Sequence, residues 1–217
     1  MASRAKHRGA AFLAGLALAA AVSAAAHAAG EHDRRLGAEA AILLGDARRL
    51  AEPAPEPQRA GLVARIRGGL SGLPLLVRQA RESNPALPPL ASGSLADIRK
   101  ALAEGNLQDA TSGLAALSRA YPFDTSGILP ADATPERLRL GRSIHQETCA
   151  GCHDRPDEHA ALPAHDLFRW ARALPEMEFA ARLYAGVRGD ALTALANPLG
   201  AAEIAALIVY YREGGRD

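Results

Sequence analysis

Residues 149–153 read CAGCH, and they contain both cysteines of the 217-residue chain. Two residues separate Cys149 from Cys152, and His153 follows directly. Thiolate and imidazole are common ligands of metal ions in proteins, and thiols also form covalent bonds to cofactors. What this segment holds determines how the residues around it must fold.

Three kinds of chemistry compete for the segment. A disulfide between Cys149 and Cys152 would leave His153 unexplained. A zinc site needs about four ligands, and a second ligand pair at zinc-finger spacing is missing from the sequence. The pattern C-x-x-C-H is instead typical of haem attachment: each thiol can add to one vinyl group of the same porphyrin, and the histidine can bind the iron. We therefore expect one covalently attached haem c, held by Cys149, Cys152 and His153.

The composition agrees with a cofactor in the core. Hydrophobic residues make up 48% of the chain, but aromatic residues make up only 4% and many of the others are alanine. A core built from such side chains alone would be thin, and a bulky cofactor would add apolar volume.

The N-terminus has the features of a secretory signal peptide over residues 1–28. Three basic residues lie within positions 1–8, the apolar stretch AAFLAGLALAAAVSAAA follows, and residues 26–28 (AHA) form a small-x-small cleavage pattern. An uncleaved anchor is the alternative. The alanine-rich, lysine-poor composition suggests a bacterium with a GC-rich genome, so we expect a periplasmic protein.

The charge of the remaining chain is nearly balanced. Without residues 1–28 it has 22 Lys+Arg and 24 Asp+Glu, a net charge of −2. Nucleic-acid binding requires a basic patch, so nucleic acid is not an expected partner. No further segment is expected to span a membrane after cleavage of the signal.

Apolar residues at helical spacing predict an all-α fold, which begins with a small domain at residues 31–122. This domain is expected to be an antiparallel bundle of four or five helices with no visible site residues. Three prolines in EPAPEPQ (52–58) end its first helix, SGLP (71–74) is expected to interrupt its second, and Pro122 ends its last.

Residues 123–133 are a linker. Thr134 and Pro135 then provide the N-cap and the first residue of a new helix. A second domain is therefore expected at residues 134–217, and it contains the CAGCH segment.

The second domain resembles the small single-haem cytochromes c with an N-terminal attachment motif (class I), over residues 134–217. The resemblance rests on GRSIHQETCAGCH (141–153), on the loop GVRGDALTALANPLG (186–200) and on the closing helix EIAALIVYYRE (203–213). It implies an N-terminal helical bundle followed by a cytochrome c-like helical domain around one covalent haem.

In that family the first and last helices cross closely. The resemblance implies that Gly141 permits this approach, that His145 replaces an aromatic residue at the crossing, and that the last helix contributes Leu207 and Tyr210.

The family also uses a proline carbonyl, shortly after the motif, to accept the second ring proton of the proximal histidine, which orients the ring. The resemblance implies that Pro163 has this role for His153, with Pro156 as the alternative.

The resemblance leaves the sixth ligand of the iron open. The family usually supplies a methionine from the loop before the last helix, where this chain has Leu192 in GDALT (189–193), and leucine cannot bind iron. Met177 is the only methionine after the signal, and we expect it to be a core residue rather than a ligand. Other candidates are weaker: His159, His165 and Asn197. The expected state is therefore an open or water-filled sixth site, or one closed by a side chain that the sequence does not identify.

These observations predict a periplasmic electron carrier rather than an enzyme, with another periplasmic redox protein or a membrane redox complex as its partner. Two alternatives stay open. The haem would bind NO, CO, oxygen or peroxide if its sixth site is open. The chain would instead be a haem subunit if its helical bundle docks on a larger redox complex.

Overall fold

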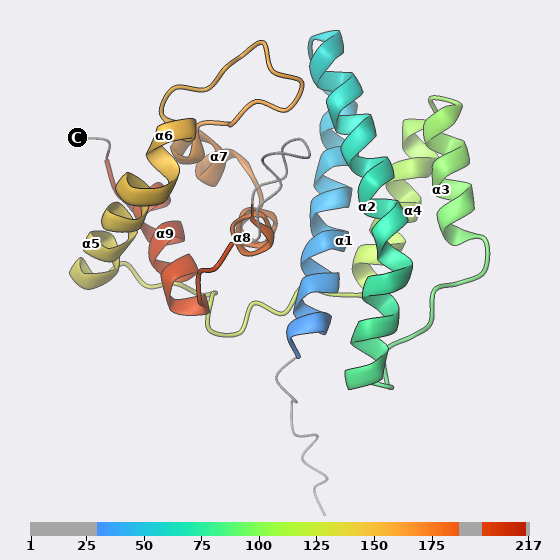
Figure 1. The fold of residues 1–217 in the computed structure, drawn as a ribbon, viewed down its shortest axis with the longest axis horizontal. Helices are drawn as coiled ribbons and strands as arrows, with labels where there is room; N and C mark the ends of the chain where they lie inside the picture. The colour runs from blue at the N-terminus through green and yellow to red at the C-terminus, as the bar shows by residue number, and fades with distance from the viewer. Residues whose placement is uncertain (1–29, 187–196, 216–217) are drawn as a thin grey trace, which may run out of the picture.

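The computed structural model describes residues 30–186 and 197–215, and over these ranges the chain is helical with no strand (Figure 1). The expected all-α fold is confirmed. The expected signal peptide, residues 1–28, and Leu192 lie outside the described residues.

The N-terminal lobe (residues 30–122) is a bundle of four described helices. They are α1 (Glu31–Leu50), α2 (Glu56–Ser83), α3 (Ser94–Ala103) and α4 (Leu107–Ala120). All four helices contribute to one apolar core, with Leu36, Ile66 and Leu114 fully buried. The apolar spacing in the sequence reflects this core, because residues three and four apart share one face of a helix.

Helix α2 is continuous, and the expected interruption at SGLP (71–74) is wrong. Pro74 lacks the N–H that would donate to the carbonyl oxygen of Leu70. The guanidinium of Arg99 in α3 donates to that oxygen instead, at 3.0 Å. Helix α2 continues because a neighbouring helix satisfies the freed carbonyl while Leu70 stays packed in the core.

Helix α2 is also, by length and composition, the one described helix that could cross a membrane, although no such segment was expected after the signal. Its Ile66 and Leu70 are fully buried in the bundle core. Its Arg65 binds Asp46 of α1 through two hydrogen bonds. The face of this helix that carries Ile66 and Leu70 is thus covered by protein, whereas Leu75 is 48% exposed.

The C-terminal lobe (residues 134–215) contains five α-helices and one π-helical turn in its described part. They are α5 (Pro135–Ile144), the π-helical turn (His145–Cys149), α6 (Ala150–His153), α7 (Leu167–Ala173), α8 (Glu176–Ala185) and α9 (Ala201–Glu213). Thr134 accepts a hydrogen bond from the backbone N–H of Arg137 at 3.2 Å, and Pro135 follows it. The predicted start of this helix is confirmed.

Helices α5 and α9 cross at Gly141. A Cβ atom at this position would lie 2.3 Å from the carbonyl oxygen of Ala206 and 2.6 Å from Cβ of Tyr210, so only glycine fits. His145 is 4% exposed, and its ring centroid lies 5.6 Å from that of Tyr210. Leu207 is fully buried beside them. The expected close crossing of these two helices is confirmed.

The two lobes share helix α1, which lies between the bundle and α8 (Figure 1). One face of α1 packs into the bundle core with Leu36 and Leu43. The opposite face packs into the core of the C-terminal lobe with Ala38 and Ile42. The C-terminal lobe is therefore closed on one side by a helix that belongs to the bundle.

Candidate haem site

The CAGCH segment lies on the helical path that begins with α5. The backbone N–H of Ala150 donates to the carbonyl oxygen of His145, five residues earlier, which makes the turn before α6 a π-helical turn. Such turns occur frequently at functional sites. Both cysteines are free thiols: Cys149 is half-buried and Cys152 is exposed.

His153 ends α6 and is held by one backbone contact. Its Nδ1 lies 2.6 Å from the carbonyl oxygen of His165. A carbonyl oxygen can only accept, so Nδ1 carries the proton and Nε2 keeps its lone pair. Burial lowers the pKa of His153, which favours this neutral form. The ring therefore has one nitrogen fixed and the other available to a metal.

The acceptor for His153 differs from the one that the resemblance implied. Pro163 is half-buried in the same loop, and Pro156 is near its start, but the bond goes to His165. A backbone carbonyl can come from any residue type. Here His165 supplies it, and His165 directly precedes Asp166, the N-cap of α7.

His145 connects the CAGCH segment to α9 through a polar chain. Its Nδ1 lies 3.0 Å from the hydroxyl oxygen of Tyr211, and its Nε2 lies 3.3 Å from a carboxylate oxygen of Asp154. Burial is the largest cause that raises the pKa of Tyr211, and the neighbouring Cys149 is the second. His145 thus occupies the position expected for an aromatic residue. It also contacts Asp154, the residue that follows His153.

His165 stacks on Trp170 of α7, with ring centroids 3.8 Å apart. The guanidinium carbons of Arg49 and Arg182 lie 4.8 and 5.3 Å from the centroid of the Trp170 ring, within reach of a cation–π interaction. Burial lowers the pKa of His165 to about 3, and the nearby arginines add to this effect. The His165 ring is therefore neutral at physiological pH.

The loop between α6 and α7 rests on the N-terminal lobe. The amide of Gln58 donates to the carbonyl oxygen of Glu158 at 3.1 Å. A Cβ atom at Gly61 would lie 2.3 Å from the carbonyl oxygen of Ala161. In Figure 1 this loop extends from α6 towards the start of α2. The segment that orients His153 is therefore packed against both lobes.

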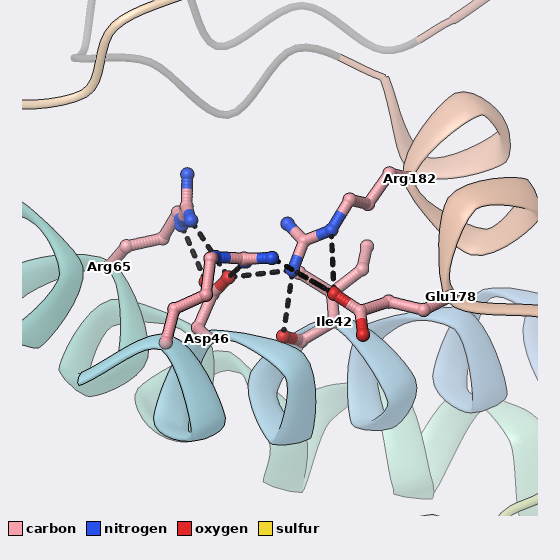
Figure 2. Close-up of polar contacts among 6 residues, drawn as sticks. Ile42, Asp46, Arg65, Glu178 and Arg182 are labelled. Atoms are coloured by element: carbon pink, nitrogen blue, oxygen red, sulfur yellow. Dashed lines mark hydrogen bonds and ion pairs between the residues drawn. The ribbon is translucent and has the colours of Figure 1, made fainter. Parts of the chain in front are cut away.

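An arginine cluster joins the lobes beside this loop (Figure 2), and sequence reasoning missed it. It consists of Asp46 and Arg49 from α1, Arg65 from α2, and Glu178 and Arg182 from α8. The carboxylate of Asp46 is fully buried and accepts hydrogen bonds from all three arginines. Glu178 accepts from Arg49 at 3.0 Å and from Arg182 at 2.8 Å.

The electrostatics of the cluster favour its ionised form. Burial alone would raise the pKa of Asp46, but Arg182 and Arg65 lower it to about 2. The sequence carried one signal for this cluster, because Asp46 comes soon after the apolar run at residues 40–44 of α1 and is followed by Arg48 and Arg49.

The candidates for a sixth iron ligand are dispersed. The expectation that Met177 is a core residue is wrong, because its side chain is 49% exposed at the start of α8 and packs in neither core. His159 is exposed in the loop. The amide of Asn197 donates to the carbonyl oxygen of Leu183 at 2.6 Å and accepts from the backbone N–H of Leu199 at 3.1 Å. Asn197 is therefore engaged with the backbone.

The described residues contain no group of three or more His, Cys, Asp or Glu side chains arranged to hold a metal ion. The zinc alternative thus gains no support from this part of the chain.

Comparison with protein-family models, curated protein sequences and solved structures found no match to this chain. The functional assignment therefore rests on the sequence and on the geometry of the described residues.

Proposed function

We propose that the chain is a periplasmic single-haem c-type cytochrome that passes one electron to or from another redox protein or a membrane redox complex. The observation that carries this proposal is the bond from Nδ1 of His153 to the carbonyl of His165. It leaves Nε2 available within a C-x-x-C-H segment whose two thiols are free.

The residues present fit a covalent haem c. Cys149 and Cys152 would hold it through thioether bonds, and His153 would bind its iron through Nε2. The haem supplies a one-electron couple when bound. The His165 carbonyl fixes the tautomer and orientation of the His153 ring and increases the basicity of Nε2.

The test is covalent haem on the purified full-length chain after export to the periplasm. We expect haem-linked peroxidase stain on denaturing gels, because thioether bonds survive denaturation. The double change Cys149→Ala and Cys152→Ala should abolish the stain, whereas Glu147→Ala, an exposed change on the same helical path, should retain it. An unstained wild-type band, or stain that survives the loss of both thiols, would refute the proposal.

A second candidate function is binding of a small ligand such as NO, CO, oxygen or peroxide at an open sixth site. It is favoured by the engagement of Asn197 with the backbone and by the exposure of Met177. In that case the ferric spectrum should be high-spin, and the ferrous protein should bind CO readily.

Two variants separate the candidates. Met177→Ala should change neither observation if the site is open, and Leu192→Met should shift the iron towards low spin and raise its potential, because a thioether ligand favours ferrous iron. A near-infrared sulfur-to-iron band in the wild type that Met177→Ala removes would instead make Met177 the sixth ligand, and the chain an ordinary electron carrier.

A further inference from the structure

The arginine cluster contains one more positive than negative charge. Three guanidiniums face two carboxylates, and the five side chains are at most 15% exposed. Buried charges are stable only when they are compensated by opposite charge and hydrogen bonds. The cluster is therefore suited to take up one further negative group.

Arg49 carries the surplus charge. Its terminal nitrogens bind Asp46 and Glu178, but its Nε is buried and has no hydrogen-bond partner among the described residues. Burial lowers the pKa of Arg49, and the charge of Arg182 lowers it further. Burial also acts against Arg182, but Asp46 and Glu178 outweigh it and raise the pKa of that residue. The two carboxylates thus compensate Arg182 more fully than Arg49.

The cluster borders the segment that orients the proposed iron ligand. The guanidinium carbon of Arg49 lies 4.8 Å from the Trp170 ring centroid, and that ring stacks on His165 at 3.8 Å. The carbonyl oxygen of His165 accepts from His153. The cationic cluster therefore contacts the Trp170 ring, that ring stacks on the His165 ring, and the backbone carbonyl of His165 contacts the residue that would hold the iron.

We propose that the arginine cluster is an oxyanion site for one propionate carboxylate of the haem, with Arg49 as its principal donor. The inference rests on the proposed haem attachment. It gives the N-terminal lobe a role in that attachment, because α1 supplies Arg49 and α2 supplies Arg65. A carboxylate suits this donor, because the hydrogen bond from a charged guanidinium N–H to a carboxylate oxygen is strong and Nε is the nitrogen of Arg49 without a partner in the described part of the chain.

The test compares Arg49→Gln with Arg59→Gln in the haem-loaded full chain. Arg59 is a matched control: it lies in α2, is half-buried and donates to the carbonyl oxygen of Leu50 at 2.9 Å, outside the cluster. Haem stain is recorded first for each protein. The midpoint potential and the propionate-bending band in the resonance Raman spectrum are then measured.

We expect Arg49→Gln to lower the midpoint potential and to shift the propionate band, because a carboxylate with less compensation favours ferric iron. Arg59→Gln should change neither quantity. Arg65→Gln provides a second variant of the cluster, with the same expected direction, should Arg49→Gln fail to fold.

Stained variants of the cluster whose potential and propionate band equal those of the wild type would overturn the inference and leave the haem proposal intact. A band and potential that change in the wild type, but not in Arg49→Gln, when inorganic phosphate is added to an anion-free buffer would assign the site to a soluble oxyanion and also overturn it. Absence of stain from every protein would refute the proposed function itself.

Discussion

Among single residues, Gly141 determines how closely α5 and α9 can pack. Any side chain there would place Cβ 2.3 Å from the carbonyl oxygen of Ala206, and that atom belongs to the α9 backbone and cannot move alone. We expect Gly141→Ala to separate α5 from α9 and to lower the free energy of unfolding by about 1–3 kcal/mol, the usual cost of overpacking. Urea denaturation would measure the change.

Gly68 is the control for this substitution, because a Cβ atom there meets nothing within 4 Å. Gly68→Ala should be neutral or should stabilise α2 by up to about 1 kcal/mol through better helix propensity. Equal effects of the two substitutions on the urea midpoint would show that the crossing does not require a glycine.

Residue-level prediction from the sequence was confirmed at the helix crossing and failed where a backbone group makes the contact. Gly141 and His145 could be assigned to the crossing because they precede Cys149 at the positions that the resemblance implied. The role of His153, which the C-x-x-C-H spacing singled out, stays a prediction. The acceptor for His153 could not be predicted, since a backbone carbonyl has no residue-type signal. The loop geometry gives it to His165 and not to Pro163.

At the scale of the element, α2 shows a local rule overridden by a neighbouring helix. A proline inside a helix removes one backbone hydrogen bond and usually ends or kinks it. Here Arg99 reaches from α3 to the carbonyl oxygen that Pro74 leaves without a donor. The start of α5 at Thr134 and Pro135 was predictable because an N-cap depends only on residues next to each other in the sequence.

The role of Arg99 can be tested with a double-mutant cycle. Arg99→Met should leave the carbonyl of Leu70 without its donor and lower the free energy of unfolding by about 1–3 kcal/mol. In the Pro74→Ala background the same change should cost less, because the alanine would restore the backbone N–H that the proline lacks. Thermal unfolding of the four proteins measures the coupling, and an equal cost of Arg99→Met in both backgrounds would contradict this account of α2.

In the molecule as a whole, helix α1 contributes to both cores, although the sequence places it in the first of two domains divided by a linker at residues 123–133. Helix α1 lies in the first segment, yet its Ala38 and Ile42 are part of the second core. The sequence of α1 has apolar residues on two opposite faces, which is typical of a helix that packs against other elements on both sides. Which helix would cover the second face was not visible, because contacts with α8 join residues more than a hundred positions apart.

Acid should weaken the contact between the lobes, because Asp46 lies fully buried in the arginine cluster. Burial alone would raise the pKa of Asp46, but Arg182 and Arg65 lower it from 3.8 to about 2. A carboxyl group with a lowered pKa in the folded state stabilises the protein above its unfolded pKa, near 4, and loses this contribution as the pH falls through about 2. The contribution is roughly 2 kcal/mol at neutral pH.

The variant Asp46→Asn tests this linkage. It leaves three guanidiniums with Glu178 as the remaining carboxylate of the cluster, so we expect it to lower the free energy of unfolding at pH 7 by about 3–5 kcal/mol. Between pH 4 and pH 2 the variant should lose less stability than the wild type, because the group that takes up the proton is gone. Asp97→Asn, on the exposed side of α3, should keep the wild-type profile. Urea midpoints measured across this pH range decide the matter: a loss of stability in Asp46→Asn equal to that of the wild type would mean that another carboxylate controls the acid transition.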